Sequence, residues 1–253
     1  MKRLAITLLL LLSFSVVFGQ SLEVKYHQVV LDFIDCIKNQ KKEKLADKVH
    51  FPLTRKYPLP EIKNKQEFLK RYNEVFDEQL VKLIVNSKPS VDWSAAGWRG
   101  IMLHSGDLWL YYNGRLLGVN YISKVEEKRR LQLIKVERNS LHSSIRTFKE
   151  PVQIIETPQY RIRIDDMGEY NYRYTSWPLK SKMSDKPALA IEKGTKIPDG
   201  SGGSYRFEFK NGEFTYDCAI LADPGPGGAS AMLTISKGGK KILFQKAKIG
   251  KFM

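Results

Sequence analysis

The sequence predicts an α+β protein in two parts, with helices in the N-terminal part and antiparallel strands throughout the C-terminal part. Two stretches before residue 90 have apolar residues at three- and four-residue spacing, which is typical of helices that bury one face. No helical stretch of ten residues is evident after about residue 145, where short alternating runs are separated by glycine-containing turns. This second pattern predicts an antiparallel β-sandwich or barrel.

The first residues have the layout of a secretory signal peptide. Lys2 and Arg3 precede an apolar run over residues 4–18, and Gly19 supplies a small residue at the expected cleavage point. We expect segment 1–19 to be removed and the remaining chain to be exported, to the periplasm or the exterior, without an integral membrane segment. The alternative is an uncleaved N-terminal anchor, although the apolar run is short for a bilayer span.

The first helix is predicted within residues 26–49, where Val30, Phe33 and Ile37 share one face. The second is predicted over residues 64–84. It begins at Asn64, a suitable N-cap followed by Glu three residues later. Between the two helices, three prolines within residues 50–62 predict short extended pieces.

A sheet is predicted after these helices. Residues 97–123 alternate around the pair Asn113-Gly114, which suits a two-residue hairpin turn in which both residues have positive φ. This register places three pairs opposite each other: Leu110 and Leu117, Leu108 and Val119, and Trp109 and Gly118. We expect the glycine to leave room for the indole ring.

The stretch RLQLIKV, residues 130–136, predicts a further strand of this sheet. The polar segment 137–151 that follows it is typical of a seam between domains. We therefore expect a first domain over residues 20–143 and a second over residues 144–253.

Two turns are predicted at Asn211-Gly212 and Gly238-Gly239. Pairing through the first of them gives one apolar face and one face of matched charge, with the pairs Phe209 and Phe214, Phe207 and Tyr216, Tyr205 and Cys218, Lys210 and Glu213, and Arg206 and Asp217. The glycine run at residues 199–203 leads into this strand and not into a helix, so no phosphate-binding loop is expected.

The hairpin around Gly168 carries the candidate ligand site. If residues 166–168 form its loop, Ile164 pairs with Tyr170 and the opposite face brings Arg161 directly across from Arg173, with Arg163 beside them. Facing like charges cost stability. The guanidinium groups therefore either extend into water or toward neighbouring acids, or they bind a carboxylate, sulfate or phosphate group through bidentate hydrogen bonds. We name Arg161, Arg163 and Arg173 as candidate anion-binding residues.

The composition is strongly basic, with 42 Lys and Arg against 27 Asp and Glu and a formal net charge of +15, of which two charges lie in the predicted signal peptide. A field of this sign favours anionic partners such as nucleic acid, acidic glycans or lipid headgroups. The basic residues form no arm and no recognisable nucleic-acid module, so nucleic-acid binding is not expected.

The sequence has two cysteines, Cys36 and Cys218. An oxidising compartment permits a disulfide between them. Cys36 lies in an apolar-rich helical stretch and Cys218 shares a strand face with Phe214 and Tyr216, so two separately buried thiols are the favoured expectation. No metal signature, cofactor motif or complete catalytic signature is present, and we predict no metal, no cofactor and no catalytic residue.

The order of elements over about residues 22–138, with the stretch GWRGIMLHSGDLWL, resembles the nuclear transport factor 2-like (cystatin-like) modules of exported bacterial proteins with two domains. The resemblance implies a cone of helices on a curved antiparallel sheet, with a pocket used by isomerases or dehydratases in some members and for binding or assembly in many others. An enzyme of this type needs a carboxylate or histidine base inside the cone. His27, His50, His104 and Asp107 are nominal candidates, but none has a spacing that demands chemistry.

The stretch SGGSYR, residues 201–206, is similar to the Ser-Gly-x-Arg-Tyr loop of bacterial inhibitors of c-type lysozyme, which are small exported β-barrels. The last two residues are reversed here, and two basic proteins repel each other on approach. The favoured expectation is a non-enzymatic exported module that binds an anionic ligand, an envelope glycan or a protein partner. The alternatives are a nuclear transport factor 2-like enzyme and an inhibitor of a cell-wall hydrolase.

Overall fold

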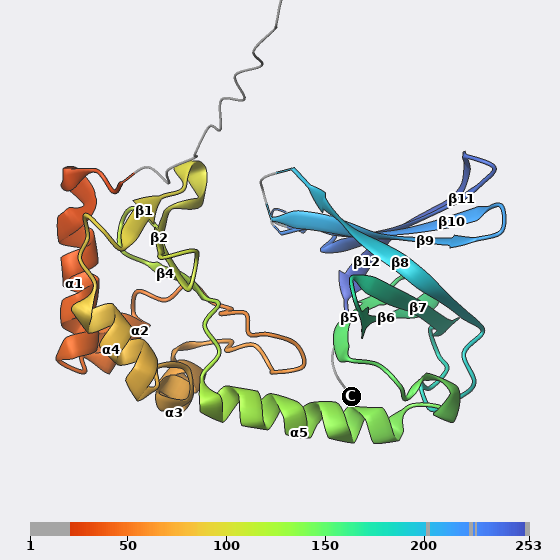
Figure 1. The fold of residues 1–253 in the computed structure, drawn as a ribbon, viewed down its shortest axis with the longest axis horizontal. Helices are drawn as coiled ribbons and strands as arrows, with labels where there is room; N and C mark the ends of the chain where they lie inside the picture. Colours follow the sequence, from red (N-terminus) through yellow and green to blue (C-terminus); the bar gives the residue numbers. More distant parts are fainter. Residues whose placement is uncertain (1–20, 201–202, 223–224, 226, 251–253) are drawn as a thin grey trace, which may run out of the picture.

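The computed structural model describes residues 21–200, 203–222, 225 and 227–250, so the predicted signal peptide lies outside the described residues. The fold is α+β. Four helices and a four-stranded sheet form the N-terminal part, and eight antiparallel strands form a closed barrel in the C-terminal part. A long helix, α5, runs from the first part along one side of the second (Figure 1). Within the described ranges, no helix is long and apolar enough to cross a membrane.

The one helix cap that the sequence analysis predicts among the N-terminal helices is present. The Asn64 side chain accepts a hydrogen bond from the Glu67 backbone N–H at 3.0 Å, which confirms the start of the second predicted helix. That helix is interrupted, because Asp77 accepts from the Leu80 N–H at 2.9 Å and caps a new one. The helices are α1 (His27–Lys38), α2 (Lys42–Ala46), α3 (Lys65–Val75), α4 (Glu78–Asn86) and α5 (Lys124–Ser140), with short 3₁₀ turns at Val24–Tyr26, Gly97–Arg99 and Ser143–Ile145.

The predicted strand at residues 130–136 is wrong, because this stretch lies in the middle of α5. Ser123 caps the helix by accepting from the Glu126 N–H at 3.0 Å. The buried face of α5 consists of Glu126, Arg130, Ile134 and Glu137, which recur at helical spacing. Of the apolar residues in this segment only Ile134 lies on the buried face, whereas Leu131 and Val136 are exposed, so their alternation is misleading.

The N-terminal sheet has the order β1-β2-β3-β4, and its strands are β1 (Trp93–Ala95), β2 (Ile101–Leu103), β3 (Leu108–Leu110) and β4 (Leu116–Val119). The predicted pairs of Leu108 with Val119 and of Trp109 with Gly118 are confirmed. The pair of Leu110 with Leu117 is wrong: Leu110 faces Leu116, because a bulge follows Trp109.

The turn of this hairpin and the packing of its indole also differ from the prediction. Tyr111 N–H donates to the Arg115 carbonyl at 2.8 Å, so the loop holds three residues, of which only Gly114 has positive φ. A Cβ on Gly118 would meet nothing within 4 Å. The Trp109 indole instead lies against Gly106, whose carbonyl accepts from the indole N–H at 3.1 Å.

The C-terminal part is a closed antiparallel barrel with the strand order β10-β11-β12-β5-β6-β7-β8-β9, which resolves the predicted choice between sandwich and barrel. Its strands are β5 (Glu150–Glu156), β6 (Tyr160–Gly168), β7 (Asn171–Pro178), β8 (Leu189–Asp199), β9 (Ser204–Asn211), β10 (Phe214–Ile220), β11 (Ala231–Lys237) and β12 (Lys240–Ile249). Aliphatic and aromatic side chains fill the interior, where the Phe209 ring occupies the space that a Cβ on Gly194 would need.

The hairpin β9-β10 has the predicted faces but not the predicted partners. Asn211 pairs with Phe214, so every pair is shifted by two residues, and Phe209 faces Tyr216 instead of Phe214. A shift of two keeps each side chain on its own face of the sheet. The predicted contact of Arg206 with Asp217 therefore persists as an ion pair of 2.9 Å, whereas Lys210 contacts Glu208 and not Glu213.

Three apolar clusters hold the described residues together. The first lies among the N-terminal helices and sheet, and the second fills the barrel. The third lies outside the barrel and includes Ile134 of α5, Leu141 just after this helix, Ile154 of β5 and Trp177 of β7. It packs α5 against the barrel wall. Whether segments 20–143 and 144–253 fold as separate units stays a prediction.

Both cysteines are free and buried, as the favoured expectation has it. Burial raises the pKa of the Cys218 thiol, which further lowers its reactivity in the folded protein. We expect a thiol reagent to label neither cysteine in the native chain and to label both after unfolding without reductant. A sample reduced before unfolding serves as the control, and a smaller number of thiols in the unreduced sample would indicate a disulfide.

Candidate functional site

The register that motivates the predicted anion site is wrong. Glu169 and Tyr170 both have positive φ, 53° and 60°, and form the two-residue turn of the hairpin β6-β7. The strands therefore pair four residues away from the predicted register. Arg173 lies opposite Asp165, an acid, and not opposite Arg161, which faces Trp177. The predicted repulsion between facing arginines does not arise.

Two of the three arginines belong to a buried ion network beside α5. The Arg163 Nη2 atom lies 2.6 Å from Asp165 Oδ1, and the Arg173 Nη2 atom lies 2.7 Å from Asp165 Oδ2. Arg163 also forms an ion pair with Glu137 of α5, whose carboxylate accepts a hydrogen bond of 2.9 Å from the Tyr57 hydroxyl. The side chains of the four charged residues are at most 4% exposed. The network therefore joins α5 to strands β6 and β7.

Burial determines the titration of this network. Burial raises the pKa of Glu137, an effect that the neighbouring Arg163 opposes. Burial and the Glu137 carboxylate both raise the pKa of Tyr57, so its hydroxyl remains protonated and can donate. Arg161, the third candidate, contacts Glu156 at 3.1 Å and donates to the Ser181 carbonyl at 2.8 Å. All three arginines thus have partners within the protein, and anion binding by them stays a prediction.

The nominal catalytic residues do not converge on one site. The His27 ring contacts the Leu22 carbonyl at 2.9 Å. The His50 ring packs edge-on against Tyr111. His104 lies 3.2 Å from Asp107 at a partly exposed position. In the part of the chain that the structure describes, no three His, Cys, Asp or Glu side chains are grouped so as to hold a metal ion.

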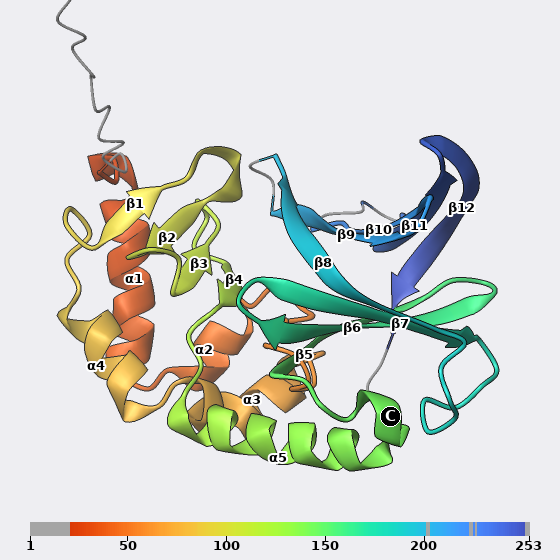
Figure 2. The same cartoon turned by 45° about the vertical axis from the view of Figure 1, so that its right-hand side comes forward.

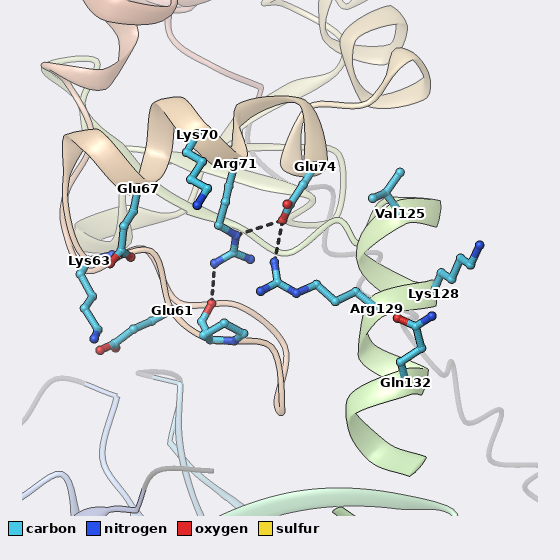
Figure 3. A pocket seen from close by; sticks show the side chains of 11 residues that line it. Glu61, Lys63, Glu67, Lys70, Arg71, Glu74, Val125, Lys128, Arg129 and Gln132 are labelled. Carbon is cyan, nitrogen blue, oxygen red and sulfur yellow. Dashed lines mark hydrogen bonds and ion pairs between the residues drawn. The ribbon is translucent and has the colours of Figure 1, made fainter. Parts of the chain in front are cut away.

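A charged, open groove lies between α3 and α5. It has a volume of about 770 Å³ and lies between residues 60–74 on one side and residues 125–132 on the other. Figure 3 shows Arg71 of α3 and Arg129 of α5 reaching from opposite walls toward Glu74. Arg71 Nε and Arg129 Nη1 lie 3.1 Å and 3.0 Å from the same Glu74 oxygen, so this carboxylate links the two helices.

A buried ion pair lies behind the groove, between residues that do not line it. Glu126, on the inner face of α5, is fully buried and forms an ion pair with Arg55, whose Nε donates to its Oε1 at 2.9 Å. Arg71 lies 3.5 Å from the same carboxylate and donates to the Pro60 carbonyl at 2.8 Å. These contacts hold α3, α5 and the proline-containing segment in fixed relative positions. The groove is therefore built on a rigid base.

The lining of the groove has more positive than negative charge. Three glutamates line it, against five basic residues, which are Lys63, Lys70, Arg71, Lys128 and Arg129. Arg71 and Arg129 share Glu74, whereas the exposed Lys63, Lys70 and Lys128 form no ion pair with any described residue. In Figure 3 the Lys128 side chain points away from the groove toward solvent. Lysines without acidic partners are available to an anionic ligand.

A second, shallower hollow lies next to the groove on the outer face of α5. It includes Lys124, Lys128 and Lys135 around the exposed side chain of Leu131, with Glu127 as its acid. Because Lys128 and Gln132 line both hollows, the groove and the second hollow form one continuous surface. This surface extends the positive charge of the groove along α5.

The sequence gives little indication of this surface. Its basic residues come from two segments about 60 positions apart, and the prediction of a strand at residues 130–136 placed the second segment in a sheet. The one local signal is the helical cap Ser123, with Glu126 three residues later, which marks the start of α5.

Comparisons with protein-family models, with curated proteins and with solved structures find no match for this chain. The resemblances to nuclear transport factor 2-like modules and to lysozyme inhibitors therefore stay predictions. Ser201 and Gly202 of the inhibitor-like stretch also lie outside the described residues.

Proposed function

We propose that this chain is an exported, non-enzymatic binding protein whose groove between α3 and α5 takes a segment of an anionic polysaccharide. The observation that carries this proposal is a group of three lysines, Lys63 and Lys70 in the groove and Lys128 at its edge, which have no ion-pair partner among the described residues while the neighbouring arginines are held by Glu74. Export follows from the predicted signal peptide and is part of the proposal.

The charged residues of the lining suit an acidic glycan better than an uncharged apolar ligand. Gln132 and the groove glutamates offer hydrogen-bond partners for sugar hydroxyls, and the lysines offer charge for carboxylate or sulfate groups. Eight of the eleven lining residues are charged, and the exceptions are Pro60, Val125 and Gln132. Because the site is open and its lysines are exposed, we expect modest affinity that falls as salt concentration rises.

The interior of the N-terminal part favours binding over catalysis. Its core is packed with apolar and aromatic side chains, among them Phe33, Phe68 and Trp93. The buried carboxylate of this part, Glu126, is neutralised by Arg55 and Arg71 and faces no described cavity. An isomerase or dehydratase needs a base that reaches its substrate, so the nuclear transport factor 2-like enzyme is the less supported alternative.

The proposal is tested by reversing two charges at the groove. In Lys70→Glu/Lys128→Glu we expect affinity for galacturonic acid oligomers, measured by titration calorimetry at low salt, to fall at least tenfold, or about 1.4 kcal/mol. Both side chains are exposed, so the fold should be retained. Neutral maltose oligomers should bind neither protein.

The matched control is Lys180→Glu/Lys186→Glu, which makes the same change of net charge at exposed positions between β7 and β8. This control should lose much less affinity than the groove variant. Equal losses in both variants would mean that only net charge matters, and absence of binding to the unchanged protein would also overturn the proposal.

A further inference from the structure

The last strand of the barrel is paired along only part of its outer edge. On one side, β12 pairs with β11 from Lys240 to Ala247. On the other side, β5 pairs with β12 only at Lys248 and Ile249. Within the described ranges, the first eight residues of β12 therefore have a strand neighbour on one side alone. Figure 2 shows β12 running down from its hairpin with β11.

One side-chain contact joins the unpaired edge of β12 to the neighbouring turn of the barrel. The Gln245 side chain donates to Gln159, in the turn between β5 and β6, at 2.8 Å. Beyond this contact, residues 240–244 have an edge that no described side chain bridges. Unpaired strand edges present backbone N–H and C=O groups in the geometry that another extended chain requires.

The side chains along this edge combine apolar surface and positive charge. Ile242 and Phe244 are 55% and 50% exposed, although large apolar side chains of strands are more often buried. They alternate with Leu243, which packs against the barrel core. The strand also has four lysines, at positions 240, 241, 246 and 248, and no acidic residue. Of these, only Lys248 forms an ion pair with a described residue, Glu156.

The charge pattern opposes pairing with a second copy of the chain. A two-fold antiparallel pairing centred on Leu243 would place Lys240 opposite Lys246 at both ends. Like charges directly across a strand pair are destabilising. An acidic strand would instead place a carboxylate opposite each lysine. The occupant that fits is therefore acidic.

We propose that the free edge of β12 is a docking site for an extended, acidic segment of a partner protein, which adds to the barrel as a further strand. Backbone hydrogen bonds to residues 240–244 align the segment. Its apolar side chains pack on Ile242 and Phe244, and its carboxylates face Lys240 and Lys246. This site lies on the barrel and does not depend on the groove between α3 and α5.

The test uses short fluorescent peptides and the chain from residue 20 onward. We expect a peptide of sequence Glu-Ser-Val-Ser-Val-Ser-Glu, which places its Glu and Val side chains on one face of an extended strand, to bind, as measured by fluorescence anisotropy. The same peptide methylated at alternate backbone nitrogens should bind at least tenfold more weakly, since it cannot pair as a strand. A peptide in which Lys replaces Glu should not bind. Equal binding of the methylated peptide would overturn the proposal in favour of charge attraction alone.

Two protein variants locate the site. Ile242→Ser/Phe244→Ser should weaken binding of the unmethylated acidic peptide at least tenfold, and the matched change Val91→Ser/Trp98→Ser, at exposed positions outside the barrel, should leave it unchanged. Lys70→Glu/Lys128→Glu should also leave it unchanged, which separates this site from the groove. Equal losses in the two serine variants would overturn the proposal. So would dimerisation in sedimentation that the β12 variant abolishes, because the edge would then belong to a second copy.

Discussion

Replacing Arg163 with Met should lower the free energy of unfolding by about 3–5 kcal/mol, the usual cost of removing one partner from a buried ion pair. Arg163 lies between the Glu137 and Asp165 carboxylates, and all three side chains are at most 2% exposed. Without the guanidinium, Glu137 keeps a hydrogen bond from Tyr57 but no cation. Urea denaturation, followed by circular dichroism, measures the loss.

Two further variants test whether the loss of stability comes from leaving the Glu137 carboxylate without a cation. Arg206→Met removes an arginine that also pairs with an acid on the barrel but is 37% exposed, and it should cost only about 0–1 kcal/mol. Adding Glu137→Gln to Arg163→Met should restore part of the stability, because the unpaired carboxylate is then gone. Equal losses in the two single variants, or no recovery in the double variant, would contradict this explanation.

The effect of Arg163→Met should also depend on pH. Burial raises the pKa of Glu137 in the folded protein, and loss of Arg163 removes an opposing effect. A carboxyl group whose folded pKa exceeds its unfolded pKa destabilises the fold as pH rises through the unfolded value, about 4.3 for glutamate. The difference from the unchanged protein should therefore be smaller below this pH than at neutral pH.

The second large effect is expected for Gly100→Ala. Gly100 has φ of 101°, and a Cβ added there would lie 2.3 Å from the Leu110 carbonyl oxygen, a backbone atom of the neighbouring strand. Backbone strain costs about 1–3 kcal/mol and overpacking costs about the same, so a total loss of about 3 kcal/mol is expected. Tryptophan fluorescence during thermal unfolding reports the change, since Trp93 is buried in this part of the protein.

Gly97→Ala is the control for this prediction. Gly97 begins the short 3₁₀ turn that Gly100 directly follows, and it also has positive φ, 59°, but a Cβ there would meet nothing within 4 Å. Only the left-handed backbone should cost stability, about 1–2 kcal/mol. If both variants unfold at the same temperature, the close approach of Leu110 has no energetic effect.

Features that depend on neighbouring residues could be predicted from the sequence. The cap at Asn64 requires only a side-chain oxygen and a backbone N–H three residues later, so its signal is entirely local. The alternation of Phe207 and Phe209 with charged residues indicates which side of β9 faces the core, and a pairing error of two residues does not change that face. The two-part α+β organisation and the antiparallel strands follow from such local patterns.

The register of a hairpin depends on finer differences. The turn at residues 169–170 requires positive φ at two residues that are not glycine, an arrangement that isolated propensities disfavour. Pairing of Arg173 with Asp165 and packing of the barrel interior accompany this turn. The candidate arginines consequently lie in an ion network and not on a face of repelling charges.

The ion network and the groove depend on partners that are distant in the chain. Glu137 meets Arg163 across 26 residues, and Glu126 meets Arg55 across 71. A helix buries charged side chains only if such partners reach them, because an unpaired charge in the interior is costly. The sequence around α5 contains the charges but no information about their partners, so its apolar residues predict a strand. Caps, strand faces and glycine turns are local properties, whereas the buried face of α5 and the surfaces beside it exist only when separate segments pack together.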